Sequence, residues 1–83
     1  MKEILELINK KHNTKLEIGQ KILVKDLLQD DDSKHIFLIK EDTFYSLNSY
    51  FKMQQADWAI GQLLLMNYKI VGTIFETKIN LGG

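Results

Sequence analysis

The sequence KHIFLIKEDTFYSLN, residues 34–48, decides the fold class of this chain. Residues 35–39 are almost continuously apolar, which is typical of a strand buried on both faces in the middle of a sheet. Glu41 and Asp42 then form a polar turn, and residues 43–47 return as a second strand. The stretch therefore predicts a β-hairpin whose first strand is central in a sheet.

The segments ahead of the hairpin predict one helix and one further strand. Asn13 suits the left-handed position that ends a helix, and Gly19 suits a turn. Alternation over residues 21–25 predicts a strand. Over residues 2–12 the apolar side chains share one helical face, which predicts a helix there: Ile4, Leu5, Leu7 and Ile8.

The segments behind the hairpin predict a second helix and a last strand. Asn48 or Ser49 is suited to cap this helix, and Asn67 follows its end. Residues 68–79 alternate cleanly, which predicts a strand with a bulge at Gly72. The helix is predicted from side chains that recur at helical spacing: Phe51, Gln55, Trp58, Ala59, Leu63 and Met66.

Together these elements predict one α+β domain over residues 1–83, in the order α-β-β-β-α-β. Two helices on one face of a small, mostly antiparallel sheet would satisfy every apolar stripe. The chain has no cysteine, which excludes disulfides and thiolate metal sites and favours a reducing, cytoplasmic compartment. The longest apolar run, residues 63–66, is far too short to span a bilayer, so no membrane partner is expected.

Charge is balanced over the whole chain but uneven along it. The net charge is zero, and all 11 basic residues are lysine. Because arginine is the usual bidentate reader of phosphate and guanine, its absence weakens the case for sequence-specific DNA recognition. Residues 26–42 carry a net charge of −4, because two lysines are outnumbered by six carboxylates: Asp26, Asp30, Asp31, Asp32, Glu41 and Asp42.

No residue pattern indicates catalysis. His12 and His35 lie on different predicted elements, and neither a zinc-protease helix motif nor a glycine-rich phosphate loop is present. Ser33 and His35 lie beside the acidic run, but catalytic triads are assembled in space and not from sequence neighbours. The sequence therefore predicts a protein that is not an enzyme and has no catalytic residue, metal or cofactor.

Two segments carry a resemblance to known proteins. Residues 16–24, LEIGQKILV, and residues 58–70, WAIGQLLLMNYKI, resemble small accessory proteins of phages and prophages from AT-rich Gram-positive bacteria. The resemblance covers residues 16–75. It implies a protein that binds and disables a host factor, as anti-CRISPR and related anti-defence inhibitors do, or one that regulates phage genes. It carries over no functional residue.

The leading functional hypothesis is a non-enzymatic phage or prophage protein that binds a host protein and inhibits a defence nuclease. Its location would be the cytoplasm of an infected or lysogenic bacterium. An acidic surface with nearby tyrosines would enter a basic channel of that target, as a set of partner-binding residues: Asp30, Asp31, Asp32, Glu41, Asp42, Tyr45 and Tyr50.

Two further partners are considered. The alternative function is a small nucleic-acid-binding regulator that contacts phosphates with lysines at positions 10, 11, 15, 21 and 25. A homodimer is the other expectation. Residues 63–66 are apolar over more of the helix than one core face needs, so one of them is expected in a dimer interface.

Overall fold

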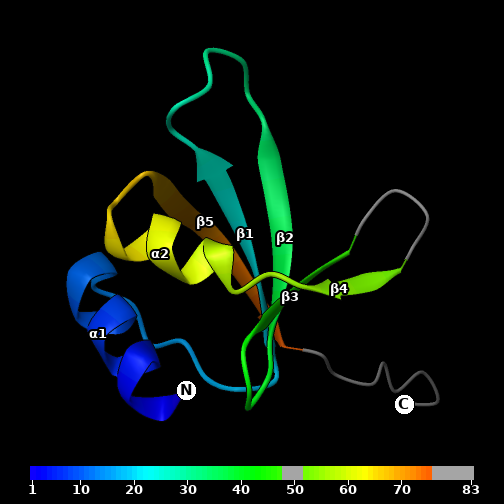
Figure 1. The fold of residues 1–83 in the computed structure, drawn as a ribbon. Coiled ribbons are helices and arrows are strands. Elements are labelled where there is room, and N and C mark those ends of the chain that lie inside the picture. The colour runs from blue at the N-terminus through cyan, green and yellow to red at the C-terminus, as the bar shows by residue number, and fades with distance from the viewer. Residues whose placement is uncertain (48–51, 76–83) are drawn as a thin grey trace, which may run out of the picture.

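The structure is a computed structural model that describes residues 1–47 and 52–75. The described elements form two helices and a five-stranded antiparallel sheet, in the order β4-β3-β2-β1-β5 (Figure 1). The predicted α+β class is therefore confirmed. The elements are α1 (Lys2–His12), β1 (Gln20–Asp26), β2 (Lys34–Ile39), β3 (Phe44–Leu47), β4 (Met53–Gln55), α2 (Trp58–Leu64) and β5 (Tyr68–Phe75).

The predicted hairpin is the centre of the sheet. β2 lies between β1 and β3, as its apolar residues on both faces indicated. Its register with β3 pairs Ile39 with Phe44 and Leu38 with Tyr45 across the turn. The backbone of Lys40 donates to the carbonyl oxygen of Thr43 at 3.0 Å and closes that turn. The prediction of a hairpin with a central first strand is confirmed.

The second helix begins later than predicted. Residues 53–55 form the edge strand β4 instead of a helical turn, and α2 begins only at Trp58. The physical reason is the free edge of β3, whose backbone groups need partners: β4 supplies them, and the Ala56 amide donates to the Phe44 carbonyl at 2.8 Å. The expected caps Asn48 and Ser49 lie outside the described residues, as does Phe51.

The remaining elements agree closely with those predicted from the sequence. α1 ends at Asn13 in the left-handed conformation (φ 57°), and Gly19 also has a positive φ of 97°. β5 has an irregular register with β1, where Gly72 lies opposite Leu23 and Val71 is the extra residue. The predicted bulge is therefore present beside Gly72. Residues 76–79, the predicted end of this strand, lie outside the described residues.

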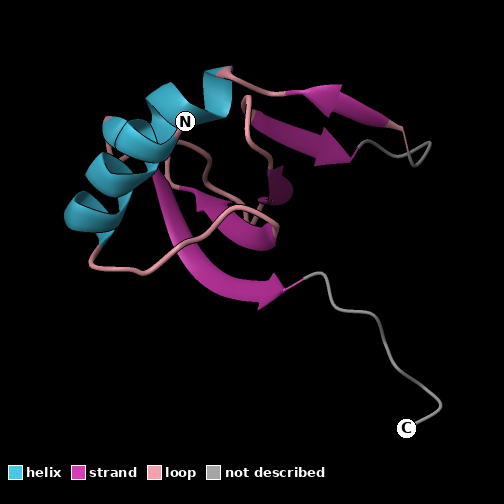
Figure 2. Cartoon of the chain, turned by 90° about the horizontal axis from the view of Figure 1, so that it is seen from below, coloured by secondary structure: helices cyan, strands magenta, loops and turns pink. Residues whose placement is uncertain are grey.

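Both helices cover one face of the twisted sheet (Figure 2). This covered face carries side chains that are fully or almost fully buried, and α1 and α2 each add two residues to the same core. Burial of this apolar surface is the main stabilising term in a domain of this size. The core contains Leu5, Ile8, Ile22, Val24, Phe37, Ile39, Phe44, Ala59 and Leu63.

Two sets of hydrogen bonds hold α1 against the rest of the fold. The Asn9 side chain accepts from the Leu16 amide at 2.7 Å and donates to the Leu16 carbonyl oxygen at 3.1 Å. It also accepts from the Thr14 hydroxyl at 2.9 Å. The His12 Nε2 atom lies 2.7 Å from the Leu63 carbonyl oxygen, which joins the last turns of the two helices. These bonds fix α1 over the covered face.

Candidate functional site

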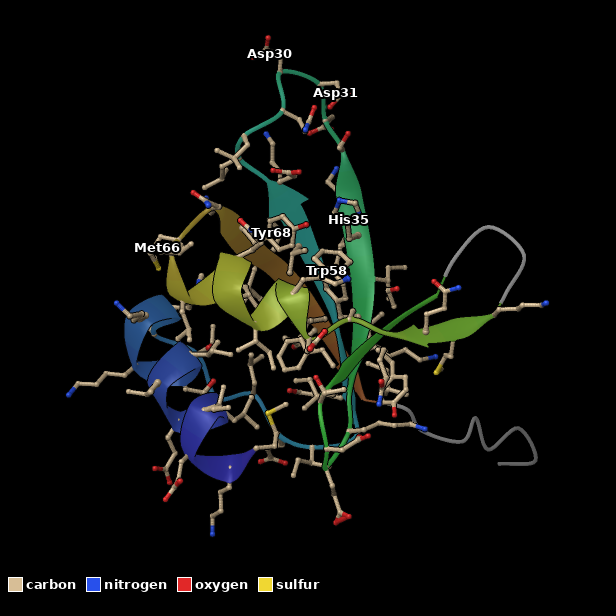
Figure 3. All side chains as sticks on the ribbon, in the orientation of Figure 1. Asp30, Asp31, His35, Trp58, Met66 and Tyr68 are labelled. Atoms are coloured by element: carbon tan, nitrogen blue, oxygen red, sulfur yellow. The ribbon has the colours of Figure 1, made fainter. Side chains whose placement is uncertain are left out.

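The predicted acidic residues do not form one surface. Asp30, Asp31 and Asp32 lie in the loop between β1 and β2, whereas Glu41 and Asp42 lie in the turn between β2 and β3 (Figure 3). These two segments are at opposite ends of β2, which is six residues long. A strand of that length separates its ends by about 20 Å. The prediction of a single acidic patch is therefore wrong.

Two carboxylates of the β1–β2 loop form hydrogen bonds or ion pairs with neighbouring side chains. Asp31 accepts from the Ser33 hydroxyl at 2.6 Å. Asp32 lies 3.2 Å from the Lys34 ammonium and 3.5 Å from that of Lys25. The hydrogen bond and charge of Lys34, followed by those of Lys25, lower the pKa of Asp32 below its ordinary value. The β1–β2 loop is therefore less acidic toward a partner than its sequence indicates.

Tyr45 lies at the other end of the sheet and is held by polar contacts. Its hydroxyl donates to Asp42 at 2.8 Å, and this bond lowers the pKa of the Asp42 carboxyl. The Gln55 side chain donates to the same hydroxyl at 3.4 Å, and the Lys40 ammonium lies 4.8 Å from the ring centroid. The second predicted tyrosine, Tyr50, lies outside the described residues.

The histidines and the serine considered for chemistry are also separated. The Ser33 hydroxyl is directed to Asp31, while the His35 ring stacks on Tyr68 at 5.6 Å. His12 lies against the α2 carbonyl described above. Among the described residues, no group of three or more His, Cys, Asp or Glu side chains is positioned to hold a metal ion.

A surface that the sequence prediction missed lies on the sheet face opposite the helices. The strand registers place one set of apolar side chains on this face, and no described element packs over it. Its central residue, Ile36, is 50% exposed, and Ile74 at its edge is 65% exposed. We call this surface the open face and define it by Leu23, Ile36, Leu38, Tyr45, Met53 and Ile74.

The open face is hollowed into a groove. The groove has a volume of about 320 Å³, and its walls are the apolar side chains of the open face together with Lys21 and Ile22. A wider and shallower depression of about 770 Å³ adjoins it at the β2–β3 turn and shares Leu38 with it. The narrower groove offers more enclosed apolar contact, so we take it as the candidate binding site.

One end of the open face carries a row of three lysines. The register places Lys34 opposite Lys25, and Lys25 opposite Lys69, across β2, β1 and β5. Like charges that lie directly opposite in a sheet destabilise it. Within the described part of the chain, Asp32 is the single carboxylate within ion-pair distance of this row. We call these residues the lysine row. Lys21 adds a further positive charge in the groove wall, where it pairs with Leu38 and Ile74.

Comparison with known proteins adds no assignment to this geometry. Neither a protein-family model, nor a curated protein, nor a solved structure matches the chain. The resemblance to phage accessory proteins stays a prediction from sequence. Of the helices in residues 1–47 and 52–75, none has the length and apolar character that a bilayer crossing requires.

Proposed function

We propose that this chain is a non-catalytic protein-binding module that engages its partner through the open face. The observation that carries this proposal is the uncovered apolar groove on a sheet whose other face is already packed by two helices. Apolar patches of this kind, rimmed by polar residues, mark interaction sites in soluble proteins. Complete burial of a Leu, Ile or Met side chain contributes about 1.5–3 kcal/mol, so this groove supplies a binding core.

The lysine row specifies the chemistry of the partner. With Lys21 it brings four positive charges to the open face, of which Asp32 neutralises one. A protein segment with apolar side chains for the groove and carboxylates beside them would match this arrangement. The partner would relieve the repulsion within the row, which gives those lysines a role in binding that they lack in the free protein.

The nature of the groove favours a protein over nucleic acid. Single-stranded nucleic acids bind sheets by stacking bases on aromatic rings, and among the described residues Tyr45 is the one aromatic side chain that lines this groove. The lysines predicted to contact phosphates also lie on different elements of the fold. Lys10 and Lys11 lie on α1 over the covered face, while Lys21 and Lys25 belong to β1. The five predicted carboxylates lie at two ends of β2, so insertion of one acidic surface into a nuclease channel has less support than binding through the open face.

A peptide-display selection tests this proposal. The whole chain is used to select binders from a random peptide library, and the binders are ranked by biolayer interferometry. We expect enrichment of peptides that combine apolar residues with Asp or Glu. Affinity should fall at least tenfold with Ile36→Asp and fall similarly with Lys69→Glu. Enrichment of basic or uniformly polar peptides would contradict the proposal.

Matched controls make the result specific to the open face. Leu7 on α1 is 52% exposed, nearly the same as Ile36, so Leu7→Asp adds the same charge at equal exposure elsewhere. Lys11→Glu is the corresponding control for Lys69→Glu. Both controls should leave peptide affinity unchanged, and equal losses in controls and test variants would remove the open face from the proposal. Tighter binding of a single-stranded oligonucleotide than of any peptide would favour the regulator instead.

A further inference from the structure

A second apolar surface lies away from the open face, where the β1–β2 loop meets the end of α2. Leu28 is 66% exposed, Leu65 is 69% exposed and Met66 is 47% exposed. The Leu27 amide donates to the Asn67 carbonyl oxygen at 2.9 Å, which ties the loop to the α2–β5 turn and places the backbones of these two segments side by side. We call this surface the loop–helix patch and define it by Leu27, Leu28, Leu65 and Met66.

The backbone that presents Met66 is unusual for its residue type. Met66 has a φ of 65°, in the left-handed region that residues other than glycine adopt only at an energetic cost. The turn is fixed by hydrogen bonds from the Met66 amide to the Leu63 carbonyl oxygen at 3.2 Å and from the Asn67 amide to that of Gln62 at 2.9 Å. The backbone that carries this exposed methionine is therefore fixed by a closed turn.

Opposite charges lie at the two ends of the loop–helix patch. Asp30 and Asp31 extend beyond Leu28 at the tip of the loop, on one side of Met66 (Figure 3). On the other side is the C-terminal end of α1, which carries Lys10 and Lys11 and is joined to α2 by the contact between His12 and Leu63 (Figure 1). Along this side of the molecule the order is therefore acidic, apolar, basic.

An arrangement of this order is complementary to itself. A two-fold axis through the apolar middle places the acidic end of one copy over the basic end of the other, at both ends of the interface. The chain has a net charge of zero, so no overall repulsion opposes association of two copies. We propose that the loop–helix patch is the interface of a symmetric homodimer, whose occupant is a second copy of this chain.

The proposed dimer is independent of the function assigned to the open face. Leu65 and Met66 at the end of α2 are outside the groove, whose residues come from the strands. The dimer would therefore carry two open faces, and a pair of linked sites binds a divalent or repetitive partner more tightly than one site does. The sequence prediction placed a dimer contact in residues 63–66. Of these, Leu63 is fully buried, so the contact would fall to Leu65 and Met66.

Sedimentation equilibrium of the whole chain tests the dimer. Over about 1 to 500 µM protein we expect a monomer–dimer equilibrium whose dissociation constant rises at least tenfold in Leu65→Asp. It should also rise with salt, because screening at about 500 mM ionic strength weakens the two charged ends. Ile36→Asp, at a half-exposed site on the open face, should leave the dissociation constant unchanged.

A charge-exchange experiment then identifies the interface itself. One variant carries Asp30→Lys and Asp31→Lys, and the other carries Lys10→Asp and Lys11→Asp. Each alone should be monomeric because equal charges meet at both ends, whereas an equimolar mixture should form a heterodimer with both ends matched. Circular dichroism checks that each variant is folded. A chain that is monomeric throughout, a dimer abolished by Ile36→Asp, or a mixture that fails to associate would overturn the proposal.

Discussion

Both faces of the sheet are apolar, but the helices cover only one of them. Phe37 and Ile39 on the covered face are fully buried beneath the helices, whereas Ile36, the residue before Phe37 on the same strand, is half exposed. Alternate residues of one strand therefore belong to the core and to a groove. The comparison shows that apolar side chains make a sheet face suitable for burial. They do not determine whether that face is covered by the same chain or by a partner.

The largest expected difference between the two faces is in stability. Phe37→Ala should lower the free energy of unfolding by about 3–5 kcal/mol, because the ring packs on Phe44, Tyr68 and Trp58 and its loss leaves a cavity. Leu38→Ala, one residue along and on the open face, should cost about 1 kcal/mol, since its side chain is already part exposed. Urea denaturation of both variants measures the difference.

Equal losses at Phe37 and Leu38 would break the comparison. They would mean that the open face is covered within the free protein and is not available to a partner. In that case the groove would be a second core, and the binding experiments on Ile36 would report unfolding instead of recognition. The stability pair is therefore best measured before the peptide selection.

A smaller effect is expected where α1 is attached to the covered face. Asn9→Ala removes three hydrogen bonds to Thr14 and Leu16 and leaves the Leu16 amide without its side-chain acceptor. We expect a loss of about 1–3 kcal/mol, the usual cost of an unsatisfied polar group that is partly buried. Hydrogen exchange should show greater opening of α1 than of β2. Uniform destabilisation of both elements would show that α1 and the sheet unfold as one unit.

The sequence was sufficient to predict the elements that are marked by regular spacing of apolar residues or by turn residues. The α1 boundaries, the left-handed Asn13, the hairpin and the bulge at Gly72 follow from local patterns, and the structure contains each of them. β4 was missed because residues 53–55 have no buried face of their own: their place is set by the free edge of β3, which is a tertiary effect. Local spacing alone therefore favoured a longer helix.

The candidate site was not predictable in the same way. The lysine row depends on the register of three strands, and the sequence separates Lys25, Lys34 and Lys69 by many residues. The acidic residues appeared to be neighbours because they are close in sequence, but a strand between them carries them apart. One usable signal was present: residues 35–39 are apolar on both faces, which is more than a sheet covered on one side needs.

The charged end of the open face offers a test in which stability and binding change in opposite directions. Lys69→Glu places a carboxylate opposite Lys25 and replaces a repulsive cross-strand pair by an attractive one. We expect the free energy of unfolding to rise by about 0.2–1 kcal/mol at low salt, and the gain to shrink as salt is added. Thermal unfolding at two salt concentrations measures it. A loss of stability would indicate that the row is not repulsive in the free protein.

The smallest expected effect concerns Asp32, which forms ion pairs with Lys25 and Lys34 of this row. Lys34 lowers the pKa of Asp32 more than Lys25 does, so Lys34→Gln should raise that pKa toward its ordinary value of 3.8. Because the folded-state pKa is the lower one, the stabilisation by Asp32 is complete above the ordinary value and is lost as pH falls through the folded-state pKa. Carboxyl NMR titration from neutral pH to about pH 2 follows it. An unchanged pKa in Lys34→Gln would assign the shift to Lys25, and the row would then be neutralised at its centre, leaving both outer lysines free for an acidic partner.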